Sequence, residues 1–249
     1  MIEIDTESFA GIECLHAAPA GKRHQSLPTV VFFHGFASSK EVYAYFGVAL
    51  AQAGFRVILP DADQHGARYE GDAAFRLSHF WEILKSSIDE LPELEAALRE
   101  KNLVAAERFA VAGASMGGMT ALGALARYSH LSCSACLMGS GYYMSLSHRL
   151  YPPLVAETAA QQEQFARRMA PLAAYDVSHQ SGSIASRPLL VWHGEADEVV
   201  PADESARLVK SLREAKLDSN LTYLTEPGVG HRITPTALEA VTRFFGRHL

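Results

Sequence analysis

Ser115 lies in a short glycine-rich segment, Gly113-Ala114-Ser115-Met116-Gly117, whose residue types suit nucleophilic catalysis. The run Arg108–Ala112 before it predicts a strand, and the pattern over Met116–Tyr128 predicts a helix. A G-x-S-x-G segment between a strand and a helix makes a sharp turn that exposes the serine hydroxyl. Glycines suit this turn because side chains at their positions would collide across it. The segment therefore predicts that Ser115 is a nucleophile.

A serine hydroxyl needs a base within hydrogen-bond reach, because it is a poor nucleophile at neutral pH. Where such a turn carries a catalytic triad, the chain order is serine, then an acid, then histidine. His231 is the favoured base, because it lies in a glycine-rich loop between the last predicted strand and the last predicted helix. The other histidines after Ser115 are His130, His148, His179, His193 and His248. His193 ends a predicted strand and is expected to be buried or to brace a loop.

The acid is expected in Gly194–Pro201, directly after the predicted strand that ends at His193. Asp197 is favoured, because the Asp-x-x-Val-Pro run leads into a helix with proline in its first turn. Glu195 and Glu198 remain rivals, whereas Asp203 suits the first turn of that helix. In the expected mechanism, Asp197 holds the histidine tautomer and stabilises the imidazolium.

Backbone amides that could bind a developing oxyanion are expected at Phe36 and Met116. Met116 follows the nucleophile and begins a predicted helix, where the partial charge is positive. Phe33-His34-Gly35-Phe36 follows an apolar run and precedes another predicted helix, so this loop is expected to supply the second amide. His34 is expected to brace the loop rather than to transfer protons.

A second polar cluster leaves other functions open. Asp61, Asp63 and His65 follow a predicted strand, and two acids and a histidine could bind a metal ion. No H-x-H or H-E-x-x-H motif accompanies them, so a polar loop near the mouth of the site is favoured. A metal-dependent hydrolase using these three residues remains an alternative, as does a non-catalytic ligand-binding protein on the same scaffold. The serine mechanism itself needs no metal and no cofactor.

Strand and helix patterns alternate along the chain, which predicts an α/β fold with a mostly parallel central sheet flanked by helices. The predicted strands are Gly11–His16, Thr29–Phe33, Phe55–Pro60, Arg108–Ala112, Ser134–Met138, Pro188–His193 and Leu221–Leu224. The predicted helices are Lys40–Ala53, Arg76–Lys101, Met116–Tyr128, Ala160–Ala170, Ala202–Ala215 and Pro235–Arg247. Pro92 is expected to break or kink the second helix. The first run or two are expected to form an antiparallel edge, because their connections are too short for crossover helices.

The segment 140–187 is longer than a simple crossover needs, and it is rich in aromatic and apolar residues. Long insertions in compact domains are usually functional or mobile, so a small helical cap over the site is predicted. An enlarged crossover helix with surface loops is the alternative. Tyr142 and Tyr143 could line an acyl pocket or simply pack the cap. The small polar stretch Gln180–Ser186 is predicted to be a flexible connector.

The 249 residues are interpreted as a single domain, 1–249, that contains this cap. The net charge of −6 argues against nucleic-acid binding as the main activity. The chain has three cysteines, Cys14, Cys133 and Cys136, and this number is too small for a disulfide framework. Cys133 and Cys136 are predicted to be small residues of the core. The N-terminus has no secretory signal pattern, and no run is long and apolar enough to cross a bilayer. A cytoplasmic protein without stable membrane insertion is expected, with its oligomeric state open.

The chain resembles the α/β-hydrolase superfamily in four motifs, which are His34-Gly35-Phe36, Gly113-x-Ser115-x-Gly117, Asp197-Glu198-Val199-Val200-Pro201 and Gly230-His231. The resemblance covers nearly the whole chain and points to the dienelactone-hydrolase and prolyl-oligopeptidase-like esterase branch. It implies a carboxylesterase that acts on small acyl esters, with Ser115, Asp197 and His231 as the triad. Thioesters remain possible substrates. The chain departs from dienelactone hydrolases in having serine rather than cysteine at the turn, and it has no room for the propeller of the oligopeptidases.

Overall fold

The computed structural model describes residues 1–249 and contains one eight-stranded sheet. The strands are β1 (Ile2–Phe9), β2 (Ile12–Pro19), β3 (Leu27–Phe33), β4 (Arg56–Pro60), β5 (Val104–Ala114), β6 (Ser134–Leu137), β7 (Leu189–Gly194) and β8 (Leu221–Glu226). Their order across the sheet is β1-β2-β4-β3-β5-β6-β7-β8. β1 and β2 are antiparallel, and the pairs from β4 to β8 are parallel. The predicted α/β fold with an antiparallel edge is therefore confirmed.

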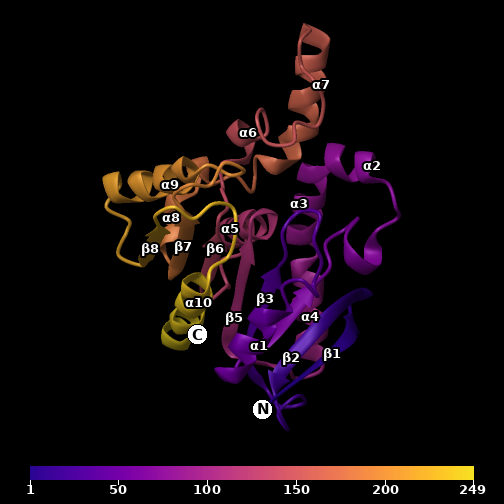
Figure 1. Cartoon of the computed structure of the whole chain (residues 1–249), viewed down its shortest axis with the longest axis vertical. Helices are drawn as coiled ribbons and strands as arrows, with labels where there is room; N and C mark the ends of the chain where they lie inside the picture. Colours follow the sequence, from indigo (N-terminus) through magenta and orange to yellow (C-terminus); the bar gives the residue numbers. More distant parts are fainter.

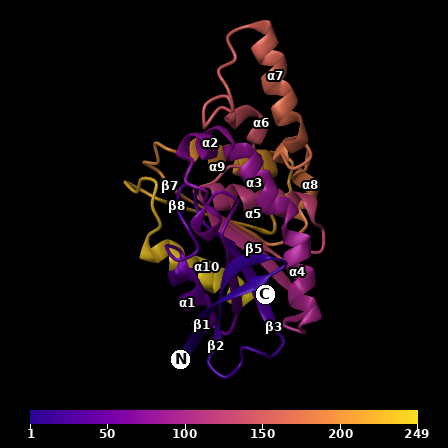
Figure 2. The same ribbon diagram turned by 90° about the vertical axis from the view of Figure 1, so that its right-hand side faces the viewer.

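Helices cover both faces of this sheet. They are α1 (Ala44–Gln52), α2 (Ala73–Ser78), α3 (Phe80–Asp89), α4 (Leu91–Glu100), α5 (Met116–Arg127), α6 (Tyr143–Leu146), α7 (Ala159–Met169), α8 (Ser181–Ala185), α9 (Ala202–Glu214) and α10 (Pro235–His248). In Figures 1 and 2, α1 and α10 lie on one side of the sheet, and α3, α4 and α5 lie on the other. None of these helices combines the length and the apolar composition that crossing a bilayer requires.

The core consists of two apolar clusters, one on each face of the sheet. All residues of β7 are buried, and so is the run Val30–Phe33 of β3, which explains why both runs are continuously apolar. On the α1 face, the ring of Phe32 stacks on that of Phe46 with their centroids 4.0 Å apart. Cys133 and Cys136 are buried and unpaired, as expected for small core residues, and burial raises the pKa of both thiols to about 12.

The first strand, β1, was not among the predicted strands. Its isoleucines alternate with acidic residues along Ile2–Glu7, and Phe9 is the one fully buried residue of the strand. It forms a hairpin with β2 in which Phe9 pairs with Ile12. The connecting residues Ala10 and Gly11 both have positive φ, at 51° and 78°, as two-residue hairpins require. The period-two alternation was thus the available signal for an exposed edge strand.

The predicted helix Arg76–Lys101 is three helices in the structure. α2 ends at Ser78, α3 begins at Phe80, and α4 begins at Leu91 with Pro92 in its first turn. The expected break near Pro92 is confirmed, because proline is accommodated where its missing N–H needs no helical partner. The separate break at His79 was not predicted.

The segment 140–187 contains α6, α7 and α8 together with two short 3-10 turns. α7 projects beyond the rest of the molecule in both ribbon views (Figures 1 and 2). The prediction of a flexible connector over Gln180–Ser186 was wrong, because Ser181–Ala185 forms α8. Ile184, the single large apolar residue of that stretch, is fully buried and anchors the helix to the core.

Candidate active site

Ser115 occupies the turn between β5 and α5, where its backbone adopts φ +57° and ψ −120°. A positive φ is uncommon for a residue with a side chain, and close packing of the turn holds it here. A Cβ at Gly113 would overlap the Gly117 carbonyl group, and a Cβ at Gly117 would overlap the Phe33 carbonyl oxygen. The Ser115 amide donates to the Leu137 carbonyl, 2.9 Å away on β6. The predicted strand–turn–helix arrangement is therefore present, and it needs both glycines.

Hydrogen bonds connect Ser115, His231 and Asp197. The Ser115 Oγ lies 2.8 Å from His231 Nε2, and His231 Nδ1 lies 2.7 Å from Asp197 Oδ2. An ionised carboxylate can only accept, so His231 Nδ1 carries a proton and Nε2 accepts from the serine hydroxyl. In this arrangement the imidazole is placed to take the hydroxyl proton. The three side chains follow the carboxyl ends of β5, β7 and β8.

Asp197 is buried, and its ionised form is extensively hydrogen-bonded. Its Oδ1 accepts from the amides of Val199 and Val200 at 2.9 and 3.0 Å. Burial alone would raise the pKa of this carboxyl. The opposing contributions are larger: hydrogen bonds from His193 and His231, the charge of His231 and the hydrogen bond from the Val200 amide. Together they hold the pKa well below its ordinary value. Asp197 therefore remains ionised beside His231.

The rival acids lie away from this chain of hydrogen bonds. Glu195 accepts from the Thr225 hydroxyl at 2.7 Å, and Glu198 is exposed. Asp203 lies in the first turn of α9, as predicted. The structure therefore brings only Asp197, among the acids considered, to His231.

His231 lies in the loop between β8 and α10, which packs closely against the loop that carries Asp197. A Cβ at Gly194 would overlap the Val229 carbonyl oxygen, so the two loops can approach only because residue 194 is glycine. The other candidate histidines have different surroundings. His193 is hydrogen-bonded to Ser205 and Val200, and His130 pairs with Glu95. His148 stacks on Phe165, His248 packs on Phe244, and His179 lies in a 3-10 turn. Of these residues, only His231 contacts Ser115.

The backbone amides of Phe36 and Met116 have no backbone acceptor within the protein. Met116 is the first residue of α5, so its N–H is one that the helix itself leaves unpaired. The loop of Phe36 lies directly against the serine, because a Cβ at Gly35 would be 3.5 Å from the Ser115 Cβ. Both amides are thus free donors next to Ser115.

His34 braces the loop between β3 and α1, as predicted. Its Nε2 accepts from the Ala62 amide at 3.0 Å, so its Nδ1 carries the proton and donates to the Gly35 carbonyl at 2.8 Å. The imidazole is almost fully buried, and burial lowers its pKa below the ordinary value. His34 is therefore neutral near pH 7 and ties the Phe36 loop to the loop after β4.

Asp61, Asp63 and His65 also have partners inside the protein. Asp61 accepts from the Lys40 amide at 2.9 Å and pairs with the Lys40 ammonium at 2.5 Å. His65 accepts from the Ala37 amide at 2.9 Å through Nε2, and its Nδ1 donates to the Asp63 carbonyl at 2.8 Å. No group of three or more His, Cys, Asp or Glu side chains is arranged around a possible metal position. These contacts support a polar loop after β4 that braces the loop after β3. The sequence analysis had predicted only that this polar loop lies near the mouth of the site.

A cavity of about 220 Å³ contains Ser115 and His231. Its other walls include Val42, Tyr43, Tyr45, Met138, Arg232 and Ile233. Sequence reasoning did not select these residues. The available signal was the aromatic pair Tyr43 and Tyr45, which follows the Phe36 loop closely in the chain.

Tyr142 and Tyr143, which were considered for the acyl pocket, do not line the cavity at Ser115. The Tyr143 hydroxyl donates to the Met119 carbonyl at 2.6 Å, and the ring is fully buried. The guanidinium of Arg207 covers the Tyr142 ring, 3.7 Å from its centroid. These contacts agree with the alternative interpretation, that the two tyrosines pack the segment 140–187 onto the domain.

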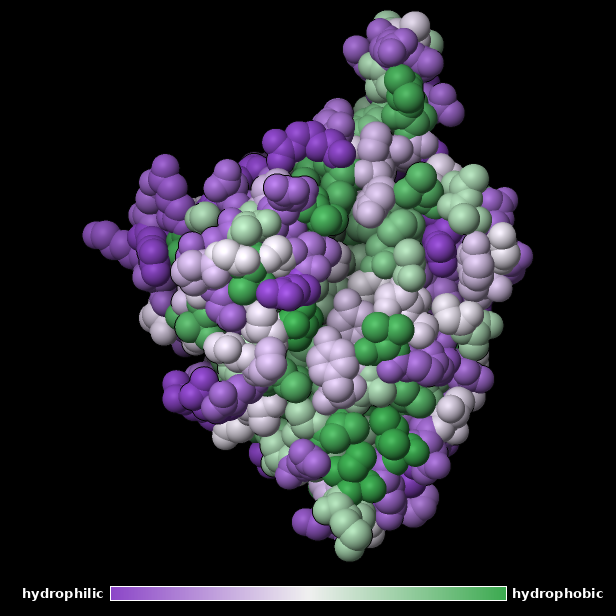
Figure 3. All heavy atoms as spheres, in the orientation of Figure 1, coloured by the Kyte–Doolittle hydropathy of each residue, from purple (hydrophilic) through white to green (hydrophobic).

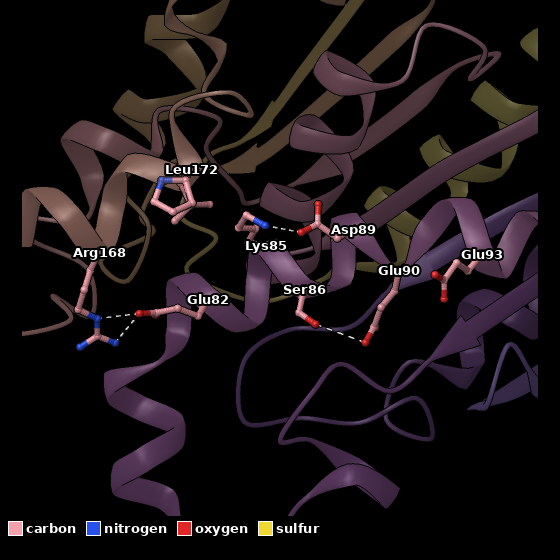
Figure 4. Close-up of a pocket in the computed structure, with 9 residues that line it drawn as sticks. Glu82, Lys85, Ser86, Asp89, Glu90, Glu93, Arg168 and Leu172 are labelled. Atoms are coloured by element: carbon pink, nitrogen blue, oxygen red, sulfur yellow. Dashed lines mark hydrogen bonds and ion pairs between the residues drawn. The ribbon is translucent and has the colours of Figure 1, made fainter.

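A larger cavity of about 530 Å³ lies elsewhere, between α3, the start of α4 and the end of α7 (Figure 4). Its charged side chains pair with one another, since Arg168 binds Glu82, and Lys85 pairs with Asp89. It contains neither the serine nor the histidine of the candidate site. The Arg168–Glu82 pair attaches the end of α7 to α3, whereas the Lys85–Asp89 pair lies within α3.

Comparison with known proteins agrees with the fold. Residues 45–249 match the model of the prolyl oligopeptidase family. Esterase YjfP of Escherichia coli (strain K12) is 53% identical over 249 residues, with 100% of both chains covered. YitV of Bacillus subtilis (strain 168) is 32% identical over 255 residues, again with 100% of both chains covered. The crystal structure of TT1662 from Thermus thermophilus superimposes on this chain with a TM-score of 0.78 at 22% identity. The alignment covers 99% of this chain and 98% of that chain, so the two proteins share the fold.

These matches confirm the resemblance inferred from the sequence motifs. The mostly parallel sheet with helices on both faces is the α/β-hydrolase fold, and the full-length relative is an esterase. The chain is therefore a hydrolase that belongs to the prolyl oligopeptidase family.

Proposed function

We propose that this protein is a serine carboxylesterase in which Ser115, His231 and Asp197 form the catalytic triad. The observation that carries the proposal is the unbroken path of hydrogen bonds from the Ser115 Oγ through His231 to Asp197. Binding alone would not need a base in contact with a strained serine. The activity of the full-length relative, an esterase, supports esters as the substrates.

In the proposed acylation step, His231 Nε2 takes the Ser115 proton while Oγ attacks the ester carbonyl carbon. The carbonyl oxygen becomes an oxyanion, to which the Phe36 and Met116 amides donate hydrogen bonds. Asp197 stabilises the imidazolium formed during the attack. When the tetrahedral intermediate collapses, the imidazolium protonates the departing alkoxide, and the acyl group remains on Ser115 as an ester.

Deacylation repeats the same proton transfers with water as the nucleophile. His231 takes a proton from water as its oxygen attacks the acyl-enzyme, and the imidazolium then returns a proton to the Ser115 oxygen. The products are the carboxylic acid and the free enzyme. A thioester would follow the same steps with a thiolate as the leaving group.

The cavity at Ser115 supports small substrates. Its volume of about 220 Å³ lies below the ~300–1,000 Å³ that is typical of sites for drug-sized ligands. Its walls combine apolar and aromatic side chains, such as Val42, Tyr45 and Ile233, with polar groups such as Arg232. On the face shown in Figure 3, apolar side chains also gather along the middle of the molecule and extend up towards α7. We therefore expect esters of short acyl chains and small alcohols to react best.

The segment 140–187 is proposed to act as a cap within the single domain. Its Tyr151 ring packs on those of Phe36 and Phe80, with both pairs of centroids 4.8 Å apart. The indole N–H of Trp81 on α3 donates to the Leu150 carbonyl of the same segment at 3.1 Å. The segment therefore contacts the loop that carries a proposed oxyanion donor, which supports a position beside the reacting ester.

Rapid mixing with p-nitrophenyl acetate tests the proposed acyl-enzyme. We expect a burst of p-nitrophenol equal to the enzyme concentration, followed by slower turnover. Ser115→Ala should remove both phases, whereas Ser129→Ala, a change at an exposed serine after α5, should leave both in place. Full turnover by Ser115→Ala would reject the proposal. Matched thioester and amide substrates, tested in parallel, would show which acyl bond the enzyme prefers.

A further inference from the structure

A second histidine contacts the proposed triad aspartate. His193 ends β7 and is fully buried, and its Nε2 lies 3.2 Å from Asp197 Oδ2 and 2.8 Å from the Val200 carbonyl oxygen. Resting on the function proposed above, we propose that His193 is a positioning residue that holds the Asp197 carboxylate and limits how strongly it stabilises the His231 imidazolium. Sequence reasoning assigned His193 only a buried or loop-bracing role.

The hydrogen-bond partners of His193 place a proton on its Nε2. A carbonyl and a carboxylate can only accept, so Nε2 carries a proton that these two oxygens share. The Ser205 Oγ lies 2.6 Å from Nδ1 and 3.4 Å from the Gly139 carbonyl oxygen. Both ring nitrogens of His193 are thus hydrogen-bonded, and the imidazole is held by α9 on one side and by the Asp197 loop on the other.

Asp197 then receives hydrogen bonds from four donors. Its Oδ1 binds the Val199 and Val200 amides, and its Oδ2 is shared by His231 at 2.7 Å and His193 at 3.2 Å. A carboxylate offers about four lone-pair positions, so this set saturates it. Because Oδ2 is shared, a donor from His193 withdraws negative charge that would otherwise act on His231. The same donor fixes the rotation of the carboxylate.

Other charged groups near these residues are engaged elsewhere or lie in solvent. Glu204, on α9 beside Ser205, accepts from the Ser140 hydroxyl at 2.8 Å and lies 3.9 Å from Arg149. Arg232, next to His231, is exposed and pairs with no acid. Within the Asp197 carboxylate's hydrogen-bond shell, His193 and His231 are thus the titratable partners.

Removal of the His193 donor has a predictable effect on the pH–rate profile. In His193→Leu, Oδ2 binds His231 alone, so the imidazolium is better stabilised and the base loses its proton at higher pH. We expect the acid limb of kcat/KM to move up by about 0.5–1 pH unit, as loss of part of a charge-assisted hydrogen bond implies. We also expect kcat on the plateau to fall about tenfold, because the carboxylate is less well positioned.

His193→Gln is the matched variant, because its side-chain amide nitrogen can occupy the place of Nε2 and donate to Asp197. It should retain the wild-type acid limb. An acid limb of His193→Leu that coincides with that of the wild type would overturn the proposal and leave His193 a purely structural role. An equal displacement in His193→Gln would also overturn it.

A measurement on the unaltered protein avoids dependence on variants that fail to fold. Two-dimensional ¹H–¹⁵N spectra report which ring nitrogens of each histidine carry a proton, and we expect a proton on Nε2 of His193. A neutral Nδ1–H form would contradict the proposal directly. If the burst at Ser115 is present while these tests fail, only the role of His193 is rejected; if the burst is absent, the triad itself is rejected.

Discussion

His65 Nε2 accepts a hydrogen bond from the Ala37 amide, so the loop after β4 is bonded to the loop after β3 directly beside Phe36. The distance is 2.9 Å, and His65 is fully buried. The polar cluster that suggested a metal site in the sequence thus supports the peptide next to the one whose N–H we assign to the oxyanion.

Loss of the His65 acceptor should impair catalysis more than binding. In His65→Leu the Ala37 amide loses its acceptor, and the neighbouring Phe36 amide is free to turn away from the oxyanion. We expect kcat to fall about tenfold or more with a smaller change in KM, because the lost contact acts on the transition state. His65→Gln, whose side-chain oxygen can accept from Ala37, should restore most of kcat. Equal kcat in all three proteins would contradict this role of the loop.

The same histidine should make folding stability depend on pH. Burial lowers the pKa of His65 from 6.5 to about 4, so the unfolded chain binds its proton first as the pH falls. The contribution of His65 is therefore complete above pH 6.5 and is lost progressively between pH 6.5 and about 4. A shift of this size corresponds to about 3 kcal/mol of unfolding free energy. Urea denaturation of the wild type and His65→Gln should diverge over this window, and parallel curves would contradict the prediction.

Asp61 should be essential for stability. Its carboxylate is fully buried and pairs with the buried ammonium of Lys40, so Asp61→Asn removes the one buried partner of this ammonium and leaves it only the exposed acids Glu13 and Glu41. We expect the unfolding free energy to drop by about 3–5 kcal/mol, measured by urea denaturation at pH 7. Glu13→Gln is the control, because Glu13 contacts the same ammonium from a half-exposed position and should cost less than about 1 kcal/mol.

Chelation separates this structural role from the metal-dependent alternative. Because Asp61 and His65 are bonded to Lys40 and Ala37, we expect EDTA to leave ester hydrolysis unchanged. Loss of activity on chelation, with recovery on addition of a divalent metal ion, would favour the metallohydrolase.

Asp197→Asn should be far more damaging than changes at the rival acids. The amide removes the negative charge from His231 Nδ1 and can favour the wrong imidazole tautomer, so kcat should fall by about 10³–10⁴-fold. Glu195→Gln and Glu198→Gln should retain kcat within about twofold, because neither side chain bonds His231. Steady-state ester hydrolysis by the three variants decides between the acids, and a large loss in either glutamate variant would overturn the assignment.

Much of the fold and site could be predicted from local sequence. The turn at Ser115 has a strong signal because Gly113 and Gly117 are required by contacts that exclude any side chain. The parallel strands were visible as continuous apolar runs, since both of their faces are covered. Asp197 was favoured over Glu195 from its place before a helix, and the structure brings it to His231.

Features that depend on contacts between distant segments were harder to infer. The bond from His193 to Asp197 requires the curvature of the β7–α9 loop, which no residue pattern reveals. Tyr142 and Tyr143 are aromatic and follow a strand, but their burial against α5 and Arg207 depends on how the segment 140–187 folds back. β1 was missed because it is an edge strand in which only Phe9 is fully buried, so its sequence contains no continuous apolar run.

The most direct test of the proposed serine chemistry is labelling of the purified protein with a fluorophosphonate, followed by peptide mass spectrometry. Because His231 contacts the Ser115 Oγ, we predict one stoichiometric adduct, on Ser115, in the wild type and none in His231→Ala under the same conditions. No adduct on folded wild-type protein, or undiminished labelling of His231→Ala, would contradict the account.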